Sequence, residues 1–176
     1  MVSPMTTQRY GGMARFFHWT MAVLIVMQFF KLGDRIDEGE HWLGQTIVPW
    51  HISVGSLLFV LIILRLITTL SQRGQRPTHI GATALLIKGG HWLLYACMVL
   101  MPITGMLTMV GNGYGLNVFG VQLVTKTEIE IGWMANLGSY HSPIAWLFVA
   151  LVIGHIGAAF YHHWVKKDDT MQRMLG

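Results

Sequence analysis

Charged residues and cysteine are both scarce in this chain of 176 residues. Asp, Glu, Lys and Arg make up 11% of the sequence, whereas a soluble domain averages about 25%. A soluble fold with so few charges would expose a mostly apolar surface, which argues against an ordinary soluble enzyme. The single cysteine, Cys97, excludes an internal disulfide framework, a four-cysteine zinc site and c-type haem attachment.

Apolar residues are instead abundant, at 53% of the chain. A transmembrane helix needs about 20 mostly apolar residues. Four stretches qualify, at roughly 15–32, 49–70, 89–110 and 140–164. The sequence therefore predicts an all-α integral membrane four-helix bundle, with residues 1–176 forming a single membrane domain. Because the first stretch has no A-x-A-like cleavage site after it, we expect it to be retained rather than removed as a signal peptide.

The basic residues are unevenly distributed between the predicted loops. The N-terminus, the second loop and the C-terminus hold nine of the 12 Lys and Arg, and the other two loops hold three. Cytoplasmic loops of membrane proteins carry the excess of basic residues, so both termini are predicted to be cytoplasmic. The same rule accounts for the net charge of +4 without a nucleic-acid partner. The predicted outer loops carry six of the eight acidic residues.

Nine histidines are many for so apolar a chain. His41 and His79 lie in predicted loops, where a solvated surface role is the simplest interpretation. An ionisable side chain within a membrane is costly and is usually functional. Seven histidines lie in or at the ends of the predicted helices: His18, His51, His91, His141, His155, His162 and His163.

Position along the helices sorts four of these histidines into two levels. His141 and His155 are 14 residues apart, which corresponds to about 21 Å of rise with both side chains on one helix face to within about 40°. His51 matches the outer level of His141, and His18 matches the inner level of His155. Two imidazoles from facing helices can bind one haem iron from both sides, so two levels predict two haems stacked across the membrane.

The chemistry of such pairs is electron transfer. Two axial histidines saturate the iron and leave no open position for oxygen activation. A zinc ion would instead require ligands that converge on one tetrahedral point. Two alternatives stay open at this stage: each histidine could be a hydrogen-bonded packing residue, and His91 competes with His18 for the inner level.

Residues around the histidines fit a flat macrocycle. Gly55 follows His51 by one turn, and small residues flank His155, although such residues also allow close helix packing. Arg65 follows His51 by 14 residues and so lies at the inner level. There it could bind a haem propionate, or it could extend to the membrane surface as a basic anchor.

Several segments together resemble the bacterial cytochrome b561 family over nearly the whole chain. They are RYGGMARFFHW, PWHISVG, GGHWLLYACMVLMPITGM, YHSPIAW, GHIGAAFYHHW and the tail KKDDTMQRM. Members of that family are four-helix dihaem b cytochromes of the bacterial inner membrane. The resemblance implies two haem b groups, with His51 and His141 as axial iron ligands of the outer haem and His18 and His155 as those of the inner haem. The family histidine that matches His91 is not usually an axial ligand, which favours His18.

The resemblance also implies electron exchange between a periplasmic small-molecule or protein partner and the quinone pool, with ubiquinone as the expected substrate. His162 lies two turns beyond His155 at the lipid–water boundary and is a candidate proton donor to quinone. It could equally be an interfacial histidine stabilised by a helix C-terminus. Some family members are associated with superoxide oxidation, but the acidic outer loops of this chain disfavour an anionic substrate.

Two other classes of function remain as alternatives. One is a haem-bearing membrane anchor subunit of a periplasmic dehydrogenase, which would retain a stable partner in mild detergent. The other is a haem-free transporter with a histidine relay. Such a protein would show no haem absorption and would not require His141 and His155 to be 14 residues apart.

Overall fold

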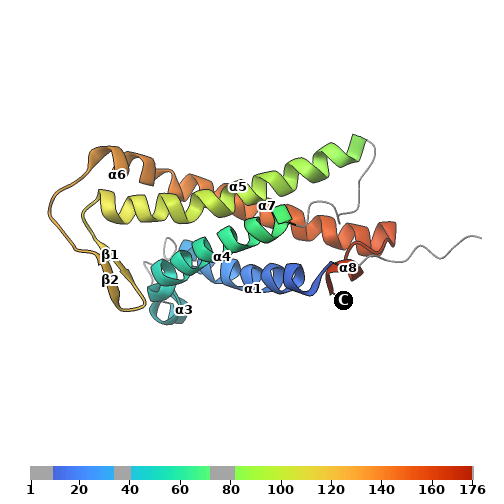
Figure 1. Ribbon diagram of the computed structural model, residues 1–176, viewed down its shortest axis with the longest axis horizontal. Coiled ribbons are helices and arrows are strands. Elements are labelled where there is room, and N and C mark those ends of the chain that lie inside the picture. Colours follow the sequence, from blue (N-terminus) through green and yellow to red (C-terminus); the bar gives the residue numbers. More distant parts are fainter. Residues whose placement is uncertain (1–9, 34–40, 72–81, 176) are drawn as a thin grey trace, which may run out of the picture.

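A computed structural model describes residues 10–33, 41–71 and 82–175. Four long helices run lengthwise through the molecule (Figure 1). Each includes a segment long and apolar enough to cross a membrane. The prediction of an integral membrane four-helix bundle is therefore confirmed. The helices are α1 (Gly12–Phe29), α4 (His51–Ser71), α5 (Ala82–Gly111) and α7 (His141–Tyr161).

The helix boundaries differ from the predicted ones mainly at α5. This helix begins at Ala82, seven residues before the predicted start at residue 89. The run from Ala82 to Lys88 is rich in strong helix formers, and the helix continues through Gly89 and Gly90. The other spans are extended by short turns: η1 (Phe30–Gly33) after α1, η2 (Val48–Trp50) before α4, and η4 (His162–Lys166) after α7.

One end of the bundle carries short elements outside the four predicted spans. They are α3 (Trp42–Thr46), α6 (Gly132–Ser139) and an antiparallel hairpin of β1 (Leu116–Val118) and β2 (Val121–Val124) (Figure 1). The hairpin turns at Phe119 and Gly120, which both have positive φ, of 50° and 85°. Such a two-residue turn normally carries Asn-Gly or Asp-Gly, so Phe-Gly concealed the hairpin in the sequence.

The hairpin is attached to the start of α4. The backbone N–H of Phe119 donates to Oγ of buried Ser53 at 2.9 Å. The Phe119 ring also lies 6.3 Å from the Trp50 ring, measured between centroids. These contacts hold β1 and β2 over the end of the bundle where α4 begins.

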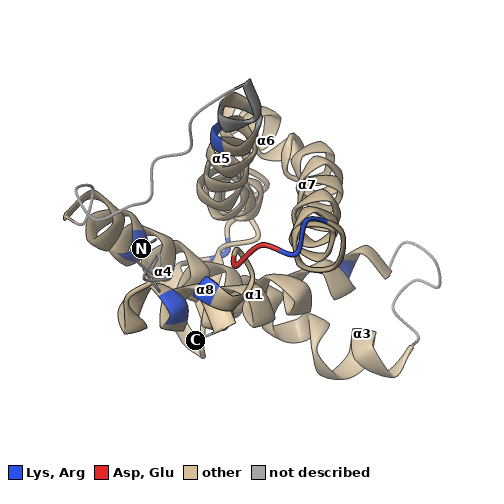
Figure 2. Ribbon diagram, turned by 90° about the vertical axis from the view of Figure 1, so that its right-hand side faces the viewer, with Lys and Arg blue, Asp and Glu red and all other residues tan. Residues whose placement is uncertain are grey.

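The helices pack in the order α1, α4, α5, α7. Seen along the long axis, they stand around the centre of the bundle (Figure 2). The main apolar core lies where α1 and α4 meet, with α5 against it, and its buried members are Met21, Val54, Leu58 and Ile62. Large apolar side chains elsewhere are exposed, for example Ile153 at 65% and Ile67 at 58%, as expected for a surface that faces lipid.

The two ends of the described chain meet at the end of the bundle opposite the hairpin (Figure 1). The short helix α8 (Gln172–Leu175) lies against the start of α1. The backbone N–H of Tyr10 donates to the Arg173 carbonyl at 3.2 Å, and Trp19 Nε1 donates to the Met174 carbonyl at 3.3 Å.

Candidate functional site

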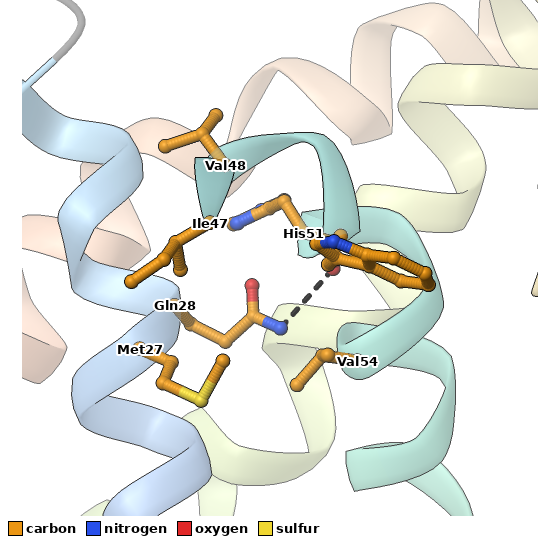
Figure 3. Close-up of a pocket in the computed structure, with 7 residues that line it drawn as sticks. Met27, Gln28, Ile47, Val48, His51 and Val54 are labelled. Atoms are coloured by element: carbon orange, nitrogen blue, oxygen red, sulfur yellow. Dashed lines mark hydrogen bonds between the residues drawn. The ribbon is translucent and has the colours of Figure 1, made fainter. Parts of the chain in front are cut away.

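The two predicted outer histidines lie together near the hairpin end. His51 is the first residue of α4, and His141 is the first residue of α7. Their ring centroids are 6.0 Å apart, with the ring planes at 87°. Both side chains are half-buried. A polar contact from α1 fixes the first turn of α4, because Gln28 Nε2 donates to the His51 carbonyl at 3.1 Å (Figure 3).

Contacts from α5 determine which nitrogen of His141 carries a proton. His141 Nδ1 lies 3.0 Å from the Met101 carbonyl oxygen and 3.1 Å from Thr104 Oγ1. A carbonyl oxygen can only accept, so Nδ1 donates. This leaves Nε2 as the nitrogen with a lone pair, as in histidines that bind metal through Nε2.

Gly105 gives the His141 ring its room. A Cβ atom at this position would lie 3.1 Å from His141 Cε1, which is closer than ordinary van der Waals contact. Three residues of α5 therefore position the His141 ring: Met101 by its backbone carbonyl, Thr104 by its hydroxyl, and Gly105 by having no side chain. None of these three residues carries a sequence signal of its own, and the sequence reasoning missed them.

Three histidines lie together at the inner level. The ring centroids of His18 on α1 and His155 on α7 are 6.3 Å apart, with the planes at 54°. His91 on α5 also approaches His155, with 5.5 Å between centroids and the planes at 82°. His91 Nδ1 lies 2.7 Å from the Ile87 carbonyl and donates to it, because a carbonyl only accepts. The structure thus brings His91 as well as His18 to His155.

Arg65 lies at this inner level, as predicted, and is half-buried rather than extended to the surface. Its Nη2 is 3.5 Å from His18 Nδ1, and its Nε donates to the Tyr95 hydroxyl at 3.2 Å. The guanidinium also stands over the Tyr95 ring, 5.7 Å from the centroid. Tyr95 was not predicted, because its approach to Arg65 depends on how α5 packs against α4.

The spacing of the rings can be tested against a metal bound between them. Two imidazoles on opposite sides of one iron hold their ring centroids about 6.3 Å apart, if each metal–nitrogen bond is about 2.0–2.1 Å. The spacings of 6.0 Å for His51/His141 and 6.3 Å for His18/His155 fit this value. The 5.5 Å between His91 and His155 is shorter.

Small residues flank His155, and Gly154 and Gly157 are both exposed. A Cβ atom added at Gly154 or Gly157 would meet no atom within 4 Å. Within residues 10–33, 41–71 and 82–175, no three or more His, Cys, Asp or Glu side chains converge on a single metal position. The described residues therefore fit an iron held between paired histidines in a haem better than a tetrahedral zinc ion.

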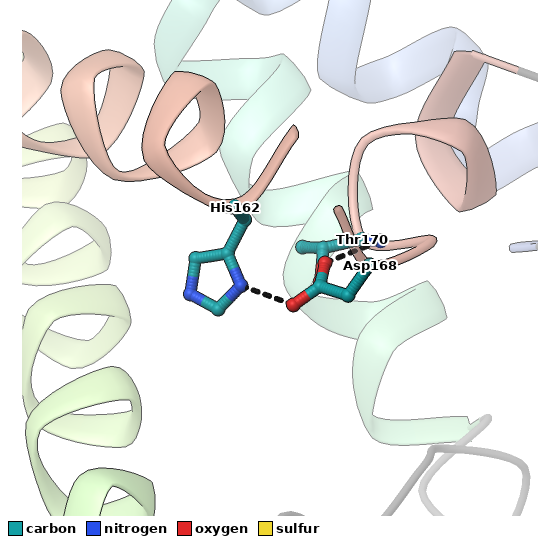
Figure 4. A network of polar contacts seen from close by, with 3 residues as sticks. All are labelled: His162, Asp168 and Thr170. Atoms are coloured by element: carbon teal, nitrogen blue, oxygen red, sulfur yellow. Dashed lines mark hydrogen bonds and ion pairs between the residues drawn. The ribbon is translucent and has the colours of Figure 1, made fainter. Parts of the chain in front are cut away.

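His162 lies at the end of α7 and pairs with a carboxylate. Its Nδ1 is 2.5 Å from Oδ2 of Asp168 (Figure 4). The tail carrying Asp168 belongs to the segments that resemble the family, but this pairing was not predicted. It depends on Lys167, which takes a left-handed conformation with φ of 53° and reverses the chain. Lysine carries no sequence signal for that conformation, which among non-glycine residues favours Asn, Asp and His.

Basic residues gather at the end where the termini lie. Of the basic residues that the structure describes, two belong to the hairpin end, Lys31 and Lys126. The remaining six are Arg15, Arg65, Lys88, Lys166, Lys167 and Arg173. Arg9, Arg35, Arg73 and Arg76, and also His79, lie outside the described residues, as do the predicted outer acids Asp34, Asp37, Glu38 and Glu40.

The whole chain is similar to proteins of a single family. The model of a family described as prokaryotic cytochrome b561 matches residues 9–176. Cytochrome b561 homolog 2 of Escherichia coli (strain K12) is 32% identical over 177 residues, which cover 97% of this chain and 93% of the relative. Probable superoxide oxidase CybB of Yersinia pestis is 24% identical over 96% of each chain. Cytochrome b561 homolog 1 of Escherichia coli (strain K12) is 26% identical over 71% of this chain and 72% of the relative.

Proposed function

From the premise that this chain belongs to the prokaryotic cytochrome b561 family, and so is a multi-pass membrane b-type cytochrome of electron transfer, we propose that it holds two haem b groups. It passes electrons between a periplasmic redox partner and the quinone pool of the bacterial inner membrane. The observation that supports this proposal is that histidines face each other in pairs at two levels. The ring centroids are 6.0 Å apart for His51 and His141 and 6.3 Å apart for His18 and His155.

His51 and His141 hold the outer haem, and His18 and His155 hold the inner haem. Haem iron with two histidine ligands supplies one-electron transfer and has no open position for oxygen. His141 is prepared for this role, because its Nδ1 donates to the Met101 carbonyl and its Nε2 is left to bind iron. His91 is the third histidine of the inner level and not an axial ligand in this proposal.

Arg65 binds a propionate of the inner haem. A guanidinium only donates, so His18 Nδ1 accepts in the contact that the structure records at 3.5 Å. With Nε2 bound to iron, the proton of the neutral imidazole would lie on Nδ1, which could then not accept. Arg65 would lose that contact, and a carboxylate would be the partner that satisfies the guanidinium best.

His162 is the proton donor at the quinone end, on the side of the membrane where the basic residues gather. Conversion of a quinone to a quinol takes up two electrons and two protons. A histidine can hold and release a proton near neutral pH. His162 is accessible there, with 22% of its side chain exposed, and it follows His155 by two helical turns.

The test of the quinone assignment is reoxidation of the reduced protein. The purified protein is reduced with dithionite and mixed with a soluble ubiquinone analogue in a stopped-flow instrument. We expect the reduced haem bands to disappear on mixing, at a rate that rises with quinone concentration. Reduced protein that reacts with ferricyanide but is indifferent to the quinone would contradict the assignment.

The periplasmic donor is proposed only as a one-electron donor. The Yersinia pestis relative is named a probable superoxide oxidase, so superoxide is one candidate. The excess of acidic residues in the predicted outer loops favours a cationic or protein donor over an anion. The rate of haem reduction by superoxide should therefore rise with ionic strength, and a rate that falls with salt would reverse this preference.

Of the alternatives, the haem-free transporter conflicts with the family to which the chain belongs. The role of membrane anchor for a periplasmic dehydrogenase involves the same haems and differs in its partner. Purification in mild detergent separates the two, because an anchor subunit retains a stoichiometric partner and reacts poorly with quinone alone.

A further inference from the structure

The helix that carries His162 changes its winding at this residue. The regular α7 ends at Tyr161, and residues His162–Lys166 form a π-helical turn. Lys167 then adopts the left-handed conformation, and the chain reverses so that the Asp168 N–H donates to the His162 carbonyl at 3.2 Å. A non-glycine residue rarely adopts this conformation and persists in it only where its surroundings hold it. Single π-helical turns are often found at functional sites.

The reversal brings the Asp168 carboxylate to the His162 ring. Asp168 Oδ2 is 2.5 Å from His162 Nδ1, and Oδ1 accepts from the Thr170 backbone N–H at 3.0 Å (Figure 4). Both oxygens of the carboxylate are therefore bound within one short loop. The aspartate has little freedom to turn away from the ring.

The same contacts keep the carboxylate ionised. Partial burial by itself would raise the pKa of Asp168, but hydrogen bonds from Thr170 and His162 outweigh it and lower the pKa to about 2. Since the pKa in the folded chain is below the ordinary 3.8, the contact is at full strength above that ordinary value. It is lost only as the pH falls towards about 2.

An ionised carboxylate determines how protons are arranged on His162. The carboxylate only accepts, so Nδ1 of His162 carries a proton. The other ring nitrogen, Nε2, is turned away from Asp168 (Figure 4). Two other titratable groups among the described residues lie close by: the Tyr161 ring is 6.1 Å from the His162 ring, and the Lys166 ammonium is 5.9 Å from the Tyr161 ring.

We propose that Asp168 is the positioning residue that makes His162 a directed proton donor for quinone; this rests on the proposed function of His162. The carboxylate holds the ring by Nδ1 and balances the charge of the imidazolium. When the quinone receives an electron by way of the inner haem, the Nε2–H bond breaks and an O–H bond forms on a quinone oxygen. The imidazole is left neutral with its proton on Nδ1, and water at the membrane surface restores the proton on Nε2.

The test compares Asp168→Asn with Asp169→Asn in the haem-loaded protein. Asp169 is the adjacent carboxylate, and its carbonyl accepts from the Arg173 backbone N–H. The measured quantities are the rates of haem reoxidation by a ubiquinone analogue and by ferricyanide, the second of which takes an electron without a proton. We expect Asp168→Asn to slow the quinone reaction by about tenfold to a hundredfold and to leave the ferricyanide rate and haem spectrum unchanged. Asp169→Asn should react as the unsubstituted protein does.

Two further variants make the outcome specific. Asp168→Glu keeps the charge and should restore most of the quinone rate. The rate of the quinone reaction in Asp168→Asn should rise more steeply with falling pH than the rate in the unsubstituted protein. Asp168→Ser gives the same test if the asparagine variant folds poorly.

Three results overturn the proposal: an unchanged quinone rate in Asp168→Asn, an equal loss in Asp169→Asn, or an equal slowing with ferricyanide. The failure of the underlying function is distinguishable. If His162→Gln itself reacts normally with quinone, His162 is not the donor. If His162→Gln is slow with quinone and Asp168→Asn is not, His162 remains the donor and only the role assigned to Asp168 is wrong.

Discussion

At the scale of single residues, the histidines act through the contacts of their Nδ1 atoms. His141 donates to a backbone carbonyl of α5, and His162 donates to a carboxylate. In both rings the Nε2 atom is left free of these contacts, and the proposed function assigns it iron binding in His141 and proton donation in His162. The second contact of each ring is therefore as important as its position along the helix.

Gly105→Ala tests the fit of His141. The new Cβ would lie 3.1 Å from Cε1, so the ring must move by a few tenths of an ångström. We expect a changed spectrum or reduced occupancy of the outer haem, with the inner haem unaffected. Gly89→Ala on the same helix is the control, because its Cβ would meet no atom within 4 Å. Identical spectra in all three proteins would mean that His141 does not bind the outer haem in the position described.

Arg65→Met tests the charge at the inner level. A positive charge stabilises the reduced haem, so its loss should lower the midpoint potential of the inner haem. The expected shift is on the order of tens of millivolts, from about 1–2 kcal/mol of Coulomb energy at an effective dielectric constant of about 20. Arg65→Lys should retain most of the potential. A redox titration checks this, and a shift confined to the outer haem would place Arg65 at the wrong level.

The sequence predicts the level and face of residues whose positions follow from their spacing along a single helix. The 14-residue spacing of His141 and His155 has a physical meaning on any long helix, so the two levels could be predicted. The level of Arg65 followed in the same way. Tyr95, Thr104 and Asp168 could not be predicted, because their contacts depend on packing between helices or on the left-handed Lys167.

At the scale of elements, the four spans were predictable from length and apolar composition alone, because a membrane requires both. The hairpin was not, because its turn residues Phe119 and Gly120 lack the usual polar signature. It matters for the outer site, since it lies over the start of α4, where His51 is the first residue.

Ser53→Ala should loosen the hairpin without moving the histidines. The N–H of Phe119 would lose its acceptor, at a cost of about 1–3 kcal/mol. Hydrogen exchange at residues 116–124 should accelerate, and both haems should remain bound. Ser56→Ala is the matched control, because Ser56 Oγ donates to the Ile52 carbonyl within α4. Unchanged exchange in Ser53→Ala would show that other contacts hold the hairpin.

At the scale of the whole molecule, α7 carries a ligand of each proposed haem and the proposed quinone-end histidine. His141, His155 and His162 follow one another along its length and into η4. Their partners His51 and His18 come from α4 and α1, and α7 itself packs mainly against α5. In the proposed function, one helix thus sets the line along which electrons cross the bundle.

The orientation of the chain in the membrane decides which end of this row of histidines faces the cytoplasm. The excess of basic residues at the end with the termini predicts that this end is cytoplasmic. A fluorescent reporter that folds only in the cytoplasm should therefore be active when fused after residue 176. Activity of a periplasmic reporter at that position instead would place His162 on the outer face and reverse the assignment of the two ends.

The most direct test of the account is the number of haem b groups per chain in single histidine variants. We predict two haems in the unsubstituted protein, one each in His141→Ala and His18→Ala, and two in His91→Ala. One haem in His91→Ala with two in His18→Ala would exchange the inner ligands. Two haems with unchanged reduced-minus-oxidised spectra in His141→Ala, or a colourless protein from cells well supplied with iron, would contradict the paired-histidine account.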